Sequence, residues 1–190
     1  MKNKKPKTLK ERALKITFDF VPVFAGVIIA LILNNIKEHR DDKKFLQNIL
    51  DKIEANAEYN IYNLEDMLKK NRKLSDSLLF YADDKSIDIS DILSKTGGMD
   101  IFPLDFSAWN VLKASPLVTD VEYEIVSKLY LLEEMNKLGN DMILNSLNMI
   151  ERGSASPLKK EKFQGDVSDF NNGCEGMMDA FKAIKEYLEE

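Results

Sequence analysis

The segment that decides the fold is the apolar run at residues 16–36, ITFDFVPVFAGVIIALILNNI, which contains no Lys or Arg. A helix of this length rises about 31 Å, which matches the hydrocarbon core of a bilayer, about 30 Å thick. A lysine-rich stretch precedes the run, and the mostly polar residues 37–190 follow it. The sequence therefore predicts a single transmembrane helix.

A cleaved signal peptide has the same order of a basic region followed by an apolar region. Its apolar part is normally about 7 to 15 residues long and ends at a small-x-small cleavage site. Here the apolar run is longer and continues into LILNNIKEHR without such a site. An uncleaved anchor is therefore the favoured interpretation.

The charges that flank the span predict its orientation. Residues 1–15 hold seven basic side chains and only one acidic one, Glu11, whereas the charges at residues 37–44 alternate in sign. Basic flanks remain on the cytoplasmic side of a membrane. We therefore expect a cytoplasmic tail at residues 1–15, the span at residues 16–36 and an external domain at residues 37–190. In a bacterium with two membranes, the anchor lies in the inner membrane and the domain is periplasmic.

The external domain is acidic. The chain carries a formal charge of −5, of which the tail contributes +6 and Asp19 −1, so that −10 remains for residues 37–190. Phosphate backbones repel a domain of this sign, so nucleic acid is excluded as an expected partner. The bilayer itself is the first predicted partner.

A helical pattern continues beyond the span, and it predicts one long helix over residues 37–81. Apolar residues recur at steps of three and four without an intervening Pro or Gly. Asn56, Asn60 and Asn71 interrupt this stripe, which favours packing in a local bundle over a strict two-stranded coiled coil. Whether the stripe packs within this chain or against another protein stays open.

Further elements follow at residues 82–118, a region that contains short helices around Ser90 and Ser107. Thr119 and Glu122 form the pattern of a capping box, which predicts a second long helix over residues 120–152. A polar stretch at residues 153–173, with Pro157, predicts a mobile loop, and a final helix is expected over residues 174–189. The predicted fold is all-α: one transmembrane helix that continues into a stalk helix, with an antiparallel periplasmic helical bundle.

Two segments carry a resemblance to a known family. The stretch DFVPVFAGVIIALILNNIKEHR at residues 19–40 has an acidic residue, six mostly apolar residues, a glycine, an aliphatic run and two asparagines. The segment SAWNVLKASPLV at residues 107–118 has an aromatic-x-x-Leu-Lys pattern with a following serine, and Pro116 stands where a glycine is usual. Both are similar to segments of a family of uncharacterised bacterial single-span inner-membrane proteins. The resemblance implies an anchor and a helical external domain, and it implies no activity.

Residues that could carry chemistry are sparse. His39 is the only histidine and Cys174 the only cysteine, so neither a metal site of zinc type nor an internal disulfide is expected. A hydrolase triad would lack a base other than His39, and no glycine-rich phosphate loop occurs. The sequence therefore predicts no catalytic residue, no cofactor and no metal.

Two surfaces are candidates for contacts with a partner. At about 100° per residue, one side of the span gathers small and polar residues, which are Asp19, Pro22, Gly26, Ala30 and Asn34. An alternative is that Asp19 and Asn34 merely mark the two membrane interfaces. The second candidate is an aromatic cluster expected at the end of the domain away from the membrane, formed by Phe102, Phe106 and Trp109. The alternative is that these aromatic side chains only fill that end of the bundle.

These observations together predict a non-enzymatic protein, a scaffold or accessory subunit of an inner-membrane complex. Its expected partner is another transmembrane protein or a second copy of this chain. The alternative is a periplasmic ligand or stress sensor. Because the short tail holds no output domain, such a sensor would signal through a membrane partner.

Overall fold

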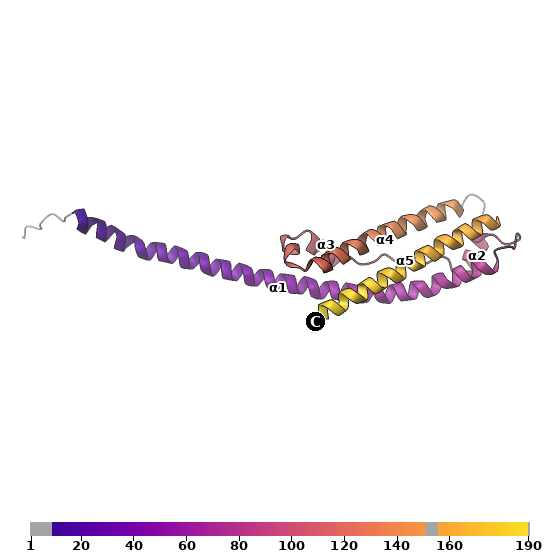
Figure 1. Ribbon diagram of the computed structural model, residues 1–190, viewed down its shortest axis with the longest axis horizontal. Coiled ribbons are helices and arrows are strands. Elements are labelled where there is room, and N and C mark those ends of the chain that lie inside the picture. The colour runs from indigo at the N-terminus through magenta and orange to yellow at the C-terminus, as the bar shows by residue number, and fades with distance from the viewer. Residues whose placement is uncertain (1–8, 151–155, 190) are drawn as a thin grey trace, which may run out of the picture. The chain divides into compact units, whose positions relative to one another are not determined.

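The computed structural model describes residues 9–150 and 156–189, with side chains for residues 20–147 and 156–189. All the regular elements among the described residues are helices, so the all-α prediction is confirmed (Figure 1). The elements are α1 (Leu9–Phe80), α2 (Ile89–Thr96), α3 (Ser107–Lys113), the 3₁₀ helix η1 (Pro116–Asp120), α4 (Tyr123–Ile150) and α5 (Pro157–Glu189).

The chain divides into two compact units, Met1–Leu46 and Gln47–Glu190, and α1 contributes residues to both. In the first unit, α1 passes through Pro22 without ending. An 18-residue window in this helix has a mean hydropathy of 1.9, and none of it is buried in the protein. Among the described residues, α1 is the one helix that is long and apolar enough to cross a membrane.

In the second unit, α1 buries the stripe that its sequence periodicity predicts. The buried members of the stripe include Ile49, Ile53, Ala57, Leu64, Met67, Leu68, Leu74 and Leu78. Helix α5 runs antiparallel to this part of α1, because its residue numbers rise as those of its α1 partners fall. The pairs are Ser75 with Gln164, Arg72 with Glu175 and Glu58 with Lys185. Helix α4 packs beside α5 in the opposite direction (Figure 1).

The C-terminal end of α1 is covered by α2 and by the first turns of α5. Leu74 and Leu78 share one buried cluster with Ile89, Ile92 and residues of α5. A capping box at the start of α2, in which Asp88 and Asp91 each accept a backbone N–H of the other, holds this short helix in place. Gly97 ends α2 with φ = 89°, a conformation that glycine adopts without strain.

An extended segment then returns along α1 from α2 to α3. Its backbone at Asp100 is bonded to the side chain of Asn71, and its backbone at Asp105 to that of Asn60. Asn56 bonds the Asp105 carboxylate and the backbone N–H of Ala108. The three asparagines that interrupt the apolar stripe of α1 therefore fasten this segment to the helix.

The prediction of a mobile loop over residues 153–173 was wrong for residues 157–173, which belong to α5. Proline is favourable at the first position of a helix, because its missing N–H has no helical partner there. Pro157 occupies that position, so this proline begins α5 and does not mark a loop. The expected final helix at residues 174–189 is only the second half of α5.

The predicted capping box at Thr119 and Glu122 does not form. Ser115 and Pro116 instead begin the 3₁₀ helix η1, and the Ser115 hydroxyl accepts the backbone N–H of Leu117. The Thr119 hydroxyl donates to the carbonyl of Pro116, so it does not cap α4. Helix α4 consequently starts at Tyr123 rather than at residue 120.

Candidate functional site

Trp109, the only tryptophan of the chain, lies at the centre of a polar and aromatic cluster between α3 and α4. Its ring is 1 % exposed and meets the ring of Tyr130 edge-on, at 4.9 Å between centroids. The ammonium group of Lys113 lies 5.7 Å from the Trp109 ring centroid, within the range of a cation–π contact. The short helix α3 therefore packs onto α4 through an aromatic side chain that is shielded from solvent.

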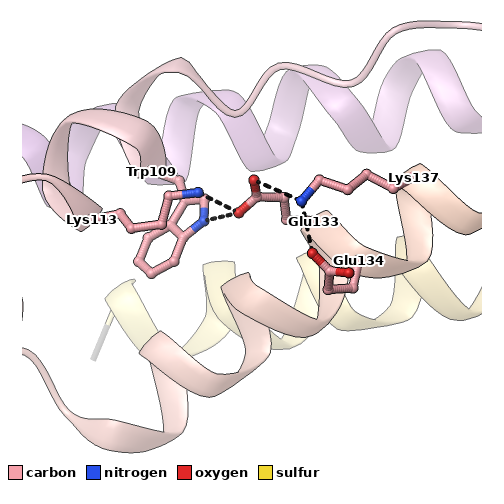
Figure 2. Close-up of polar contacts among 5 residues, drawn as sticks. All are labelled: Trp109, Lys113, Glu133, Glu134 and Lys137. Carbon is pink, nitrogen blue, oxygen red and sulfur yellow. Dashed lines mark hydrogen bonds and ion pairs between the residues drawn. The ribbon is translucent and has the colours of Figure 1, made fainter.

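Glu133 on α4 connects this cluster. Figure 2 shows Trp109 and Lys113 approaching its carboxylate from one side and Lys137 from the other. Glu133 Oε2 accepts from Trp109 Nε1 at 3.0 Å and from Lys113 Nζ at 2.6 Å, and Lys137 Nζ lies 3.5 Å from Oε1. The hydrogen bond from Lys113, followed by that from Trp109, lowers the pKa of Glu133. Trp109, Lys113 and Lys137 thus surround the Glu133 carboxylate, and this is the arrangement of a structural ion pair.

The structure places the predicted aromatic contact surface differently. Trp109 is buried, so it contributes nothing to an exposed surface, and the interpretation as core filling describes it. The rings of Phe102 and Phe106 are partly buried and pack edge-on or tilted against Tyr59 and Phe181. Tyr59 lies in the first half of the α1 stretch of this unit, whereas α2 covers the end of α1. Within the second unit, these aromatics therefore lie beside the first half of its α1 stretch and not at the end that α2 covers.

The predicted partner face on the span lies in the first unit. Pro22, Gly26, Ala30 and Asn34 are exposed there, as are all the described side chains of residues 20–41. A Cβ atom added at Gly26 would meet nothing within 4 Å. The side chain of Asp19 lies outside the described residues. The helical spacing puts the other four on one side of α1, and the described part of the chain leaves that side uncovered.

A surface groove runs between α4 and α5, and it was not anticipated from the sequence. Its volume is about 220 Å³, and its lining is mostly apolar. The lining residues are Met135, Leu138, Gly139, Met142, Asp169, Phe170, Gly173 and Met177. By contrast, the space enclosed between α1, α3 and α5 next to Trp109 is about 10 Å³, which is no more than one water molecule needs.

Groups with intrinsic reactivity are few in the described part of the chain. Cys174 is buried in α5, and its burial raises the pKa of its thiol to about 12, so the reactive thiolate is suppressed at neutral pH. No group of three or more His, Cys, Asp or Glu side chains among the described residues could hold a metal ion.

Sequence reasoning also missed a buried lysine. Lys160, expected in a mobile loop, is fully buried in α5, and its ammonium group donates to the carbonyl oxygens of Tyr81 and Asp84 beyond the end of α1. A lysine followed at three- and four-residue steps by Phe163, Val167 and Phe170 does lie on one helical face, and this spacing was the available signal.

Comparisons of the chain with known protein families, with curated proteins and with solved structures give no match.

Proposed function

We propose that this chain is a non-enzymatic, membrane-anchored scaffold or accessory subunit of an inner-membrane complex. The observation that carries the proposal is the apolar stretch of α1, which has a mean hydropathy of 1.9 and is wholly unburied within the protein. Exposure of a continuous apolar surface of this length to water is unfavourable, whereas its exposure to the hydrocarbon core of a bilayer is favourable. The basic residues 1–15 before it orient the acidic helical unit toward the periplasm.

The character of the second unit supports a role in assembly rather than in chemistry. Several of its charged side chains form ion pairs, as in the Glu133 cluster, and the space beside Trp109 is too small for a substrate. Its helices pack as an antiparallel bundle on the stalk part of α1. An anchor joined to such a bundle positions a binding surface at a defined membrane.

The partner in the membrane contacts the face of Gly26 and Ala30. Small residues four apart allow two helix backbones to approach closely, and an acidic residue in a span prefers protein or water to lipid. A side chain at Gly26 would meet nothing in the described part of this chain. The substitution Gly26→Leu therefore leaves the protein's own packing unchanged and blocks only an outside helix.

Purification of the full chain from native membranes in mild detergent tests the proposal. A second membrane protein is expected in stoichiometric amount; Gly26→Leu should abolish its recovery and Asp19→Asn should weaken it. Ile28→Leu, an exposed change on the same helix that adds no bulk, is the matched control and should recover the partner fully. Recovery of a bound small molecule without any protein partner would instead support a sensor.

A further inference from the structure

The groove between α4 and α5 is an apolar surface that the second unit does not cover. Leu138, which lines the groove, is 68 % exposed, and Leu131, about two helical turns earlier on α4, is also exposed. Met135, Met142 and Met177 are three of the residues that line it. Thioether side chains adapt to differently shaped apolar partners. Both helices are continuous along the groove (Figure 1), so its walls are preformed.

Gly173 leaves open space in the wall of this groove. A Cβ atom added there would meet nothing within 4 Å, whereas a Cβ at Gly139, on the opposite wall, would make an ordinary van der Waals contact of 3.5 Å with the ring of Phe170. The groove therefore has room at position 173 for atoms from outside the second unit, and a larger side chain at that position would fill this room.

The rim of the groove is negatively charged. Asp169 lies in its wall on α5, and Glu134 and Asp141 flank Leu138 on the exposed side of α4. No ion pair joins Asp141 or Asp169 to another residue in the described part of the chain. Lys137 pairs with Glu133 and Glu134, so it does not offset the other two carboxylates.

We propose that this groove binds an amphipathic helix of a partner protein, with an apolar face in the groove and Lys or Arg residues beside that face. The inference rests on the proposed function and specifies the chemistry of the periplasmic contact. Helices commonly dock their apolar faces into grooves of this kind, and complementary charge selects among them. A second copy of the same face would bring its own carboxylates against Asp141 and Asp169, and an anionic lipid surface would be repelled in the same way.

Binding of two designed peptides to the full chain in nanodiscs of neutral lipid tests the proposal. Both are amphipathic 18-residue helices with the same leucine pattern, one with lysine and one with glutamate at the flanking positions. Fluorescence anisotropy, with empty nanodiscs as background, measures each affinity. The lysine peptide is expected to bind at least tenfold more tightly than the glutamate peptide.

Variants connect that binding to the groove. Gly173→Leu fills the open space and raises helix propensity, so the protein should keep its melting temperature and lose at least tenfold in affinity for the lysine peptide. Asn172→Leu, at an exposed neighbouring position that does not line the groove, introduces the same side chain and should bind as the wild type does. The double change Asp141→Asn and Asp169→Asn should reduce the preference for lysine over glutamate.

Equal affinity for both peptides, no binding of either, or wild-type binding by Gly173→Leu would overturn the proposal. A dimer in sedimentation experiments that Gly173→Leu dissociates would overturn it in favour of a second copy. Co-purification of a membrane partner is measured separately with Gly26→Leu. The groove assignment can therefore fail while the accessory-subunit proposal stands, and the reverse also holds.

Discussion

The side-chain amide of Asn71 forms two hydrogen bonds with the backbone of Asp100. Asn71 Oδ1 accepts the Asp100 N–H at 2.8 Å, and Asn71 Nδ2 donates to the Asp100 carbonyl at 2.9 Å. Asn60 holds Asp105 in the same way, at 2.8 and 2.9 Å. Both asparagines are fully buried. Each amide pairs with a backbone that has left regular structure and would otherwise have no partner.

The distance between the two asparagines on α1 matches the distance between their two partners, Asp100 and Asp105. Asn60 and Asn71 are eleven residues apart on α1, which corresponds to about 16.5 Å along a helix axis. Asp100 and Asp105 are five residues apart in an extended chain, which also spans about 16.5 Å. Residues 100–105 therefore span the distance between Asn71 and Asn60 in an extended conformation. This match explains why polar residues interrupt the apolar stripe at these positions.

Replacement of Asn71 by Ala should lower the free energy of unfolding by about 2 to 4 kcal/mol, because it leaves a backbone donor and a backbone acceptor of Asp100 unpaired. Urea unfolding of the full chain in detergent, followed by circular dichroism, measures the loss. Asn63, whose amide donates to a carbonyl of its own helix at a more exposed site, provides the control Asn63→Ala, with an expected loss below about 0.5 kcal/mol. Equal losses in both variants would contradict this role of Asn71.

The parts of the fold that follow from local pattern could be predicted. The three- and four-residue steps of α1 predict a buried face, and Ile53, Leu64 and Leu74 are buried members of it. In α5 the same periodicity is present at Phe163, but Pro157 and the polar character of residues 153–173 predicted a loop. The burial that α5 gains against α1 and α4 outweighs the cost of the three glycines inside the helix, Gly165, Gly173 and Gly176.

Contacts between distant segments could not be predicted in the same way. The partner of Asn71 is twenty-nine residues away, and that of Lys160 is more than seventy residues away, so neither pairing leaves a local signal. The groove depends on the register between α4 and α5, which sets Gly173 opposite Met135 and Met142. The sequence did identify Gly26 and Trp109 as notable, but only the structure separates an uncovered position from a buried one.

Glu133 should make stability depend on pH. Its pKa is lowered in the folded protein, so its contribution is full above the unfolded value of about 4.5 and is lost as the pH falls through the lowered folded value. At pH 7, Glu133→Gln should cost about 1 to 2 kcal/mol, since it weakens the charge-assisted bond from Lys113. At pH 3 the difference between variant and wild type should shrink.

Urea unfolding, followed by the fluorescence of Trp109, measures the cost of Glu133→Gln at pH 7 and at pH 3, because Trp109 itself contacts Glu133. Glu134→Gln is the matched control, because Glu134 also pairs with Lys137 but is largely exposed. Its effect should be small at either pH. A pH-independent cost of Glu133→Gln would mean that shape, rather than charge, explains the contribution of this residue.

Lys160 should stabilise the junction between α1 and α5. Lys160→Met keeps the apolar stem and removes the ammonium group that serves the carbonyls of Tyr81 and Asp84, so the free energy of unfolding should fall by about 1 to 3 kcal/mol. Lys52→Met, at an exposed position of α1, should change it by less than about 0.5 kcal/mol. A stable Lys160→Met protein would show that water replaces the ammonium group at these carbonyls.

The orientation of the chain can be tested by labelling introduced cysteines in cells whose outer membrane has been permeabilised. Glu161 is exposed on α5, unlike its buried neighbour Lys160, and Lys4 lies in the basic tail. A membrane-impermeant maleimide should label Glu161→Cys and leave Lys4→Cys unlabelled, because the basic flank remains cytoplasmic. The native Cys174 should give little background, since burial raises the pKa of its thiol to about 12. Disruption of the inner membrane should make both introduced cysteines reactive. Labelling of Lys4→Cys alone in intact inner membranes would show that the chain has the opposite orientation.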